Sequence, residues 1–469
     1  SNSGTAIEGA TSETLQIQQN ELGSKYYYCN IKSTVAYTLD DDGKPQGGFS
    51  AERKSNIATV KVVDVPGIGY FQKDDAAGTA EKPYKINTLA DLKELKSIVE
   101  KGYGLSGIYF KLESNIGLPS DWSPIGNLKE DKTVMLPNGT TIGDEEKGKN
   151  VNPFMATFDG DGHTITIPSN GKALFKYVRE ATIKNLNVLG EQIDGSAFIS
   201  NSFVDYGKDG DYKTTGVERT VTIDNCRLLN GSKTSGAGFL PGSGSGKNKV
   251  YILNSTVEKN VIIGNESDPI AGGSFIGALN GQIVNCVSYA TVYGQGGLAG
   301  HKGESMGACT IANSAFLGKL ISNTYAGGII GSGYNGYGSN GVNSAPNTPV
   351  VAIRNCYVVA DITGVGNVGG ILGTEPSCEC CWSNGKGTIS NNYFKGTLTE
   401  TSGKGNVGGV AGFLKSFDKY QGFDDNFYEK ECGAKLGIGK IETIITKSTP
   451  KYGAAYGIDY EFDENKVCT

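Results

Sequence analysis

The chain has 469 residues, and 69 of them are glycine, about twice the usual share. This length predicts more than one structural unit. The net charge is -6 without a basic stripe, which argues against nucleic acid or an anionic membrane surface as the main partner. The sequence predicts no membrane span, because no apolar run approaches the length of a transmembrane helix. Two histidines leave little for His-based catalysis.

Residues 1–66 carry the pattern of short antiparallel strands. Residues 12–18 and 56–63 alternate polar and apolar residues, and glycine, asparagine and aspartate separate the segments. The chain starts Ser1-Asn2-Ser3, with neither methionine nor a signal peptide, which predicts a processed or truncated piece of a longer protein. Residues 67–82 are predicted to form a linker.

An amphipathic helix is predicted after residue 83. The run Thr88-Leu89-Ala90-Asp91 has the form of a capping box, and the helix of roughly 13 residues should end at Gly102. Its apolar residues share one face: Leu92, Leu95, Ile98 and Val99. We expect this face to cover the open end of a stack of repeats, which would otherwise present unpaired strands.

An Ile-x-Asn triplet recurs from residue 180 onward, at spacings of 28 to 42 residues. The third residue after the asparagine is apolar in six of seven copies, and a Gly-Gly segment follows in several copies. The seven asparagines are Asn185, Asn225, Asn254, Asn285, Asn313, Asn355 and Asn391.

The offsets within each repeat predict a corner at the asparagine. Side chains of a strand alternate between faces, so the isoleucine at minus two and the apolar residue at plus three belong to different strands. Asparagine tolerates a left-handed backbone, and we expect these side chains to form an inward-facing ladder between coils, with Gly-Gly permitting the next bend. Coils of roughly 28 residues without intervening helices predict a right-handed parallel β-helix. The alternative, an antiparallel sandwich, would not reproduce the same offsets.

The ten cysteines divide into groups. Cys226, Cys286 and Cys356 each follow a corner asparagine and should stand two coils apart, at roughly 9 to 10 Å, which is too far for a disulfide. They are predicted to be buried free thiols. A second group, Cys378, Cys380 and Cys381 with Cys432 downstream, leaves a metal site, a disulfide and free thiols open.

Other candidate chemistry is sparse. Asp159, Asp161 and His163 lie close together but lack the spacing of a calcium loop, so a β-turn is the simpler interpretation. Neither convergent carboxylates at matching offsets nor a His-Glu-x-x-His motif occurs. The prediction is therefore a protein that is not an enzyme and carries no metal and no cofactor.

Two segments resemble known families. Residues 1–66 resemble the second half of a bacterial immunoglobulin-like domain, through 5–15, Tyr27-Tyr28-Cys29 and 55–62, and the missing first half implies that Cys29 has no partner in this chain. Residues 80–430 resemble proteins with the GLUG motif, through Gly297-Leu298-Ala299-Gly300, Trp122-Ser123-Pro124-Ile125-Gly126 and residues 158–165. The second resemblance implies a bacterial protein that is secreted or located at the cell surface.

The predicted fold is all-β: a partial immunoglobulin-like sandwich (1–66), a linker (67–82), a helical cap and leading segment (83–165), β-helix repeats (166–430) and a C-terminal segment (431–469). The longest insertions, 332–350 and 374–388, fall at one phase of the repeat and should emerge along one edge. They carry the candidate ligand-binding residues Tyr334, Tyr337 and Trp382. The alternative is that these insertions only pack on one another and cover the stack. The predicted function is adhesion, with a glycan or a host or matrix protein as partner. A structural stalk and a polysaccharide-active enzyme are the alternatives.

Overall fold

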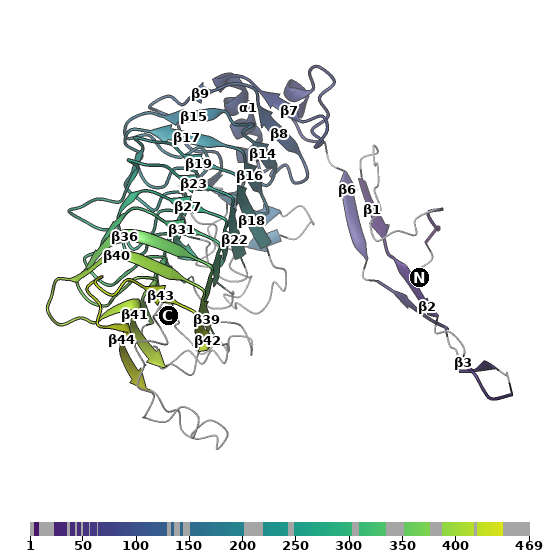
Figure 1. Cartoon of the computed structure of the whole chain (residues 1–469). Helices are drawn as coiled ribbons and strands as arrows, with labels where there is room; N and C mark the ends of the chain where they lie inside the picture. The colour runs from purple at the N-terminus through teal and green to yellow at the C-terminus, as the bar shows by residue number, and fades with distance from the viewer. Residues whose placement is uncertain are drawn as a thin grey trace. The chain divides into compact units, whose positions relative to one another are not determined.

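The computed structural model describes most of the chain (Figure 1). The described residues are 4–8, 23–34, 38–42, 45–47, 50–55, 57–62, 64–128, 133–135, 141–143, 151–200, 219–242, 248–302, 309–333, 351–375, 387–416 and 420–443. The chain divides into two compact units, one of residues 1–66 with 135–141 and the other of residues 67–134 with 142–469. Each unit is described by itself below.

The first unit is built from nested antiparallel strand pairs. β1 (Gly23–Tyr27) pairs with β6 (Ala58–Val62), β2 (Asn30–Thr34) with β5 (Ser50–Lys54), and β3 (Thr38–Leu39) with β4 (Pro45–Gln46). Where two of these pairs meet, the backbone N–H of Ser55 donates to the carbonyl of Cys29 and the backbone N–H of Cys29 donates to Ser55 Oγ, both at 2.8 Å. No described side chain of this unit is buried. The predicted strand at residues 12–18 lies outside the described residues, so the immunoglobulin-like sandwich stays a prediction.

The second unit is a parallel β-helix, which confirms the predicted fold class. From residue 219 onward each described coil contributes strands to three parallel sheets, and the strands pair with their counterparts in the next coil (Figure 1). The first sheet consists of β7 (Tyr84–Ile86), β8 (Tyr109–Leu112), β14 (Thr157–Asp159), β16 (Thr182–Lys184), β18 (Arg219–Asp224), β22 (Asn248–Leu253), β26 (Gly281–Val284), β30 (Cys309–Ala312), β35 (Ala352–Arg354), β39 (Gly387–Ser390) and β42 (Tyr420–Asp424).

The second and third sheets complete each coil. The second sheet consists of β9 (Ile116–Gly117), β15 (Thr164–Ile167), β17 (Asn187–Gly190), β19 (Arg227–Leu228), β20 (Lys233–Thr234), β23 (Thr256–Val257), β24 (Ile262–Ile263), β27 (Val287–Ser288), β28 (Thr291–Tyr293), β31 (Ala315–Phe316), β32 (Lys319–Ile321), β36 (Tyr357–Gly364), β40 (Tyr393–Glu400) and β43 (Phe427–Tyr428). The third sheet consists of β21 (Leu240–Gly242), β25 (Ile276–Leu279), β29 (Ala299–Lys302), β33 (Ala326–Gly327), β34 (Ile330–Ser332), β37 (Val368–Gly369), β38 (Leu372–Glu375), β41 (Val407–Ser416) and β44 (Leu436–Thr443).

The repeated triplet sets the register of the first sheet. Its isoleucines are fully buried and stand opposite one another in successive coils, as in Ile223 opposite Ile252 and Ile252 opposite Ile283. Every asparagine of the triplet has a left-handed backbone, with φ between 49° and 56°. Asp425, with φ 51°, takes the same place in the last described coil, where the sequence pattern had not marked a repeat.

The corner asparagines face outward, and the expectation of an inward ladder is wrong. Asn185 is half-buried, and the other six are exposed. Their amides still connect the coils on the outside: Asn225 donates to Asn185 at 2.8 Å and Asn285 donates to Asn254 at 3.2 Å. Alternation along an extended strand would place the asparagine inward, whereas a left-handed residue belongs to neither strand and turns its side chain away from the core.

The inside of this corner is occupied by the next residue of each repeat. These buried residues are Leu186, Cys226, Ser255, Cys286, Ser314, Cys356, Asn392 and Asn426. Ser314 Oγ accepts a hydrogen bond from the backbone N–H of Cys286 at 3.1 Å and donates to the carbonyl of Ala312 at 2.8 Å. The inner ladder therefore satisfies backbone groups that the turn would otherwise leave unpaired in the core.

The Gly-Gly segments permit close contact between coils rather than an unusual backbone conformation. Gly328 has no positive φ, but a Cβ atom built there would lie 2.1 Å from the carbonyl oxygen of Gly370 and 2.8 Å from the side chain of Val358. Gly370 meets Gly409 and the ring of Phe394 in the same way. Glycine is needed here because the backbones of neighbouring coils and the large inner side chains leave no room for a Cβ atom.

The helix α1 (Leu89–Glu100) lies at the end of the stack where β7, β8 and β9 are found (Figure 1). Its capping box is formed by Thr88 and Asp91, and the four predicted apolar residues are fully buried, which confirms the helical cap. Residues 67–82, predicted as a linker, contribute the short helix η1 (Ile68–Phe71), whose buried Phe71 packs against Tyr84 and Phe110. Two further short pairs are β10 (Asn127–Leu128) with β13 (Val151–Asn152), which is antiparallel, and β11 (Thr133–Met135) with β12 (Thr141–Gly143).

Candidate functional site

The predicted ligand-binding residues Tyr334, Tyr337 and Trp382 lie outside the described residues. The strands that flank their loops are described, however, and they show where both loops leave the stack. Ser332 at the end of β34 stands opposite Thr374 in β38, and Ala352 in β35 stands opposite Thr388 in β39. The two loops therefore begin and end on adjacent coils.

Connections of variable length leave the coils at the same corner. The link from the first sheet to the second is always short in these coils, as between Asp224 and Arg227. The link from the third sheet to the first varies from one residue, between β25 and β26, to the long connection between β34 and β35. Insertions therefore collect along the edge where the third sheet leads into the first.

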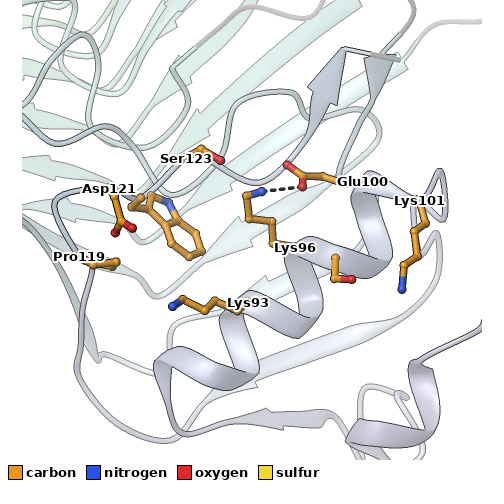
Figure 2. A pocket seen from close by; sticks show the side chains of 9 residues that line it. Lys93, Lys96, Glu100, Lys101, Pro119, Asp121 and Ser123 are labelled. Atoms are coloured by element: carbon orange, nitrogen blue, oxygen red, sulfur yellow. Dashed lines mark hydrogen bonds and ion pairs between the residues drawn. The ribbon is translucent and has the colours of Figure 1, made fainter. Parts of the chain in front are cut away.

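A cleft of about 500 Å³ lies beside α1 (Figure 2). Lys93, Lys96 and Lys101 of the helix line it, opposite Pro119 and Asp121. The ammonium group of Lys96 is paired with Glu100 one turn later. Trp122 also contributes to the wall but is only 7% exposed, so the cleft offers little apolar surface. It is a solvated helix flank with mixed charges.

A row of aromatic side chains, two exposed and one half-buried, runs along the outer face of the second sheet. Tyr357 in β36 stands opposite Tyr393 in β40, and Tyr393 stands opposite Phe427 in β43. The rings of Tyr357 and Tyr393 are stacked, with centroids 5.5 Å apart and planes 10° from parallel. Tyr357 is 44% exposed and Phe427 is 37% exposed. We call these three residues the aromatic ladder.

Charged groups border the aromatic ladder. Lys395 and Glu429 lie two residues after Tyr393 and Phe427, on the same outer face, and form an ion pair of 3.0 Å. The hydroxyl group of Tyr393 reaches Glu429 at 3.5 Å, and the Glu429 carboxylate raises the pKa of Lys395. On the other side, Asn355 and Asn391 of the exposed corner precede the two tyrosines. Hydrogen-bonding groups therefore flank the rings on both sides.

The acidic turn near the start of the stack has a structural role. Asp159 accepts hydrogen bonds from the Asn185 amide and the backbone N–H of Asp161, both at 2.9 Å, and pairs with Lys184 at 3.1 Å. Burial opposes the ionisation of Asp159, but these contacts hold its pKa below the ordinary value. Asp161 pairs with Lys111 at 2.9 Å. The predicted turn is present, with Asp161 and Gly162 in left-handed conformation.

The three cysteines of the repeat are buried and free, and their thiol groups have the same surroundings. Cys226, Cys286 and Cys356 each direct Sγ to backbone carbonyl oxygens 3.3 to 3.6 Å away. Burial raises the pKa of each thiol to about 12. Cys378, Cys380 and Cys381 lie outside the described residues. Within the described part of the chain, no group of three or more histidine, cysteine or acidic side chains is placed to hold a metal ion.

The aromatic ladder was missed by sequence reasoning. Its signal is present: the second residue after the corner is aromatic in the three successive copies that contain Asn355, Asn391 and Asp425. The signal was overlooked because exposed aromatic residues were expected only in the insertions, and the repeat itself was expected to supply only core positions.

Comparison with known proteins adds little to this description. No family model matches the chain, and no curated protein matches it. Among solved structures, the chain is similar to one named IgA1 Protease, with a TM-score of 0.37 and 15% sequence identity. The match covers 82% of this chain and 23% of the other. None of the helices in the described ranges has the length and apolar character of a membrane span.

Proposed function

We propose that this chain is a non-catalytic, secreted or surface-located β-helix that binds an extended ligand, a glycan or a host or matrix protein. The observation that supports this proposal most directly is the common origin of the two longest late insertions. The insertion that carries Tyr334 and Tyr337 and the insertion that carries Trp382 begin and end on adjacent coils. Such a set of neighbouring loops on a rigid scaffold is a frequent arrangement for recognition.

The sequence resemblances support the same location. The Gly-Leu-Ala-Gly segment at 297–300 lies at the start of β29, within the regular part of the stack. A GLUG-type repeat and an immunoglobulin-like first unit would both fit a bacterial surface protein.

An enzymatic role is the weaker alternative. A polysaccharide-cleaving β-helix needs carboxylates that converge on one substrate bond. The acidic residues described above are instead taken up by ion pairs and turns, as with Asp159 and Asp161. Asp424 and Asp425 are exposed at the corner of the last described coil. A stalk that only displays another module stays the leading alternative, and a binding experiment separates it from the proposal.

The test is a binding screen of the full chain against immobilised collagen and fibronectin and against soluble mannan, xylan and β-glucan. We expect at least one probe to bind, and the triple variant Tyr334→Ala, Tyr337→Ala, Trp382→Ala to lose that binding with an unchanged melting temperature. The control is Tyr289→Ala, next to β27 of the second sheet and away from the insertion edge. Absence of binding to every probe would favour the stalk. Survival of binding in the triple variant would show that the binding site lies outside these three residues.

A further inference from the structure

We propose that the aromatic ladder of Tyr357, Tyr393 and Phe427 is a glycan-binding strip, distinct from the insertion edge. This inference rests on the proposed ligand-binding function and assigns a ligand class and a surface to it. The strip uses residues of the regular repeat, so its geometry is fixed by the strand pairing of three successive coils.

The three rings are not needed to fill the core. The residues that follow them, Val358, Phe394 and Tyr428, point inward and are buried. The ladder residues point outward, and two of them expose more than a third of their surface. Large aromatic side chains held in a row on a solvated face mark a surface for binding rather than for packing.

The area of the strip favours a small ligand over a protein. A fully covered aromatic side chain contributes about 150 to 250 Å², so three rings less than half exposed offer on the order of 300 Å². A stable protein interface needs about 800 Å² from each partner. Half-buried Val359 beside the ladder adds little to this area. A second copy of the chain, or a globular partner, would therefore find too little apolar surface here.

The polar groups beside the rings fit a polyhydroxylated ligand. Lys395 and Glu429 offer charged donors and an acceptor next to the ladder, and the Tyr393 hydroxyl group already contacts Glu429. The corner amides of Asn355 and Asn391 are exposed on the other side. A sugar has apolar C–H groups that lie against an aromatic ring and hydroxyl groups around its rim that hydrogen-bond to such neighbours.

The spacing of the strip fits a polymer. Successive coils lie about 4.7 to 4.9 Å apart, and each of three coils contributes one ring to the same column. Because the rings of Tyr357 and Tyr393 are stacked on each other, a linear polysaccharide lying along the axis of the stack would meet the outer edge of a ring at each step. The ladder thus selects for an extended chain of repeating units over a single sugar.

The experiment is affinity electrophoresis of the full chain in native gels that contain mannan, xylan, β-glucan or hyaluronan, followed by calorimetry with the retarding polymer. The variants are Tyr357→Ala, Tyr393→Ala and their combination, each paired with Tyr→Phe at the same position. Tyr289→Ala is the matched control, because Tyr289 lies on the same outer face but outside the ladder. We expect a loss of affinity of about tenfold for each ring removed, retention with phenylalanine, and no change for the control.

The outcomes separate this inference from the proposed function. Loss of polysaccharide binding in the ladder variants, with full binding in the Tyr334, Tyr337 and Trp382 variant, supports the strip as the binding site. It also excludes the insertion edge as the site of polysaccharide binding. Binding that survives the double ladder variant overturns the strip. Failure of all four polymers to retard the wild-type chain also overturns it, even where collagen or fibronectin binds and the proposed function stands. Equal melting temperatures of the wild-type chain and the alanine variants are required for each conclusion.

Discussion

The side-chain amide of Asn355 donates a hydrogen bond to the side-chain oxygen of Asn313, 3.0 Å away in the preceding coil. Both residues have a left-handed backbone, with φ of 55° and 50°, and both are exposed. The corner thus has two separate components, an outer amide contact and a backbone conformation that most residues avoid.

Replacing Asn355 with leucine should lower the free energy of unfolding by about 1 to 2 kcal/mol, because a branched residue is strained at positive φ. Replacing it with glycine, which adopts this conformation readily, should cost clearly less. Denaturant titration monitored by circular dichroism measures both changes. Equal destabilisation by glycine and leucine would show that the outer amide, rather than the backbone conformation, stabilises the corner.

The inner ladder predicts a different response one residue further on in the next coil. Asn392 accepts the backbone N–H of Cys356 at 2.9 Å and donates to the carbonyl of Ile353 at 3.1 Å, both in the buried corner. Asn392→Leu should destabilise the fold by about 1 to 3 kcal/mol, because it leaves these backbone groups unpaired.

Serine offers the matched control at that position. Ser255 and Ser314 accept the corresponding N–H in other coils, at 3.1 Å each, so Asn392→Ser should preserve this hydrogen bond and cost less than leucine. Both variants are compared by denaturant titration. If leucine is tolerated as well as serine, the hydrogen bonds of the inner corner contribute little to stability.

The buried thiols should resist alkylation in the native protein. Burial raises the pKa of Cys226, Cys286, Cys309 and Cys356 to about 12, so at pH 8 these thiols stay protonated as well as inaccessible. Cys29 is exposed and should react before these four. Mass spectrometry after brief iodoacetamide treatment, with and without guanidinium, measures this order. Labelling of Cys226 as fast as Cys29 in native buffer would contradict the buried ladder.

The cap should weaken in acid through Asp91. Burial raises the pKa of Asp91, but hydrogen bonds from the Tyr70 hydroxyl group and the backbone N–H groups of Asn87 and Thr88 outweigh burial and hold the pKa below its ordinary value. The stabilisation by Asp91 is therefore present above the unfolded pKa of about 4 and is lost as the pH falls through the lower folded value.

Asp91→Asn should accordingly reduce the melting temperature at pH 7 and reduce it less at pH 3, where the wild-type carboxyl group is also becoming protonated. The loss at pH 7 should correspond to about 1 kcal/mol, the usual contribution of a helix cap. Lys93→Gln, on the exposed flank of α1, is the control. An equal loss at both pH values would show that the charge of Asp91 is not involved.

The fold could be predicted from the sequence because the spacings between key residues are the same in every repeat. The buried isoleucine, the left-handed asparagine and the inward residue at plus three recur around a corner of constant length, and only stacked coils give this combination. The inward direction of Asn285 or Asn355 was wrong because alternation of side chains holds only while the backbone is extended. At a residue with positive φ the inward and outward alternation of side chains is interrupted, and the residue after the asparagine takes the inner position.

The candidate site was less accessible to sequence reasoning for a physical reason. Tyr357 and Tyr393 become neighbours only through the parallel register of β36 and β40, which brings together residues that are 36 positions apart. The chain also contains many other tyrosines, 24 in all, and composition alone does not distinguish a row on one face from scattered side chains. The Lys395–Glu429 pair beside them depends on the same register.

The constant register also bears on how such a protein changes length. Ile252 stands opposite Ile283, and Ile283 stands opposite Ile311, so the coil of residues 281–308 lies between two coils with identical alignment. The other strands of that coil keep the same frame, since Ile263 faces Val292 and Val292 faces Leu320. Recombination that removed or duplicated this one segment would shift no inward side chain to the outside. It would change the length of the stack by a single step of about 4.8 Å. The β-helix can therefore gain or lose length during evolution one whole coil at a time.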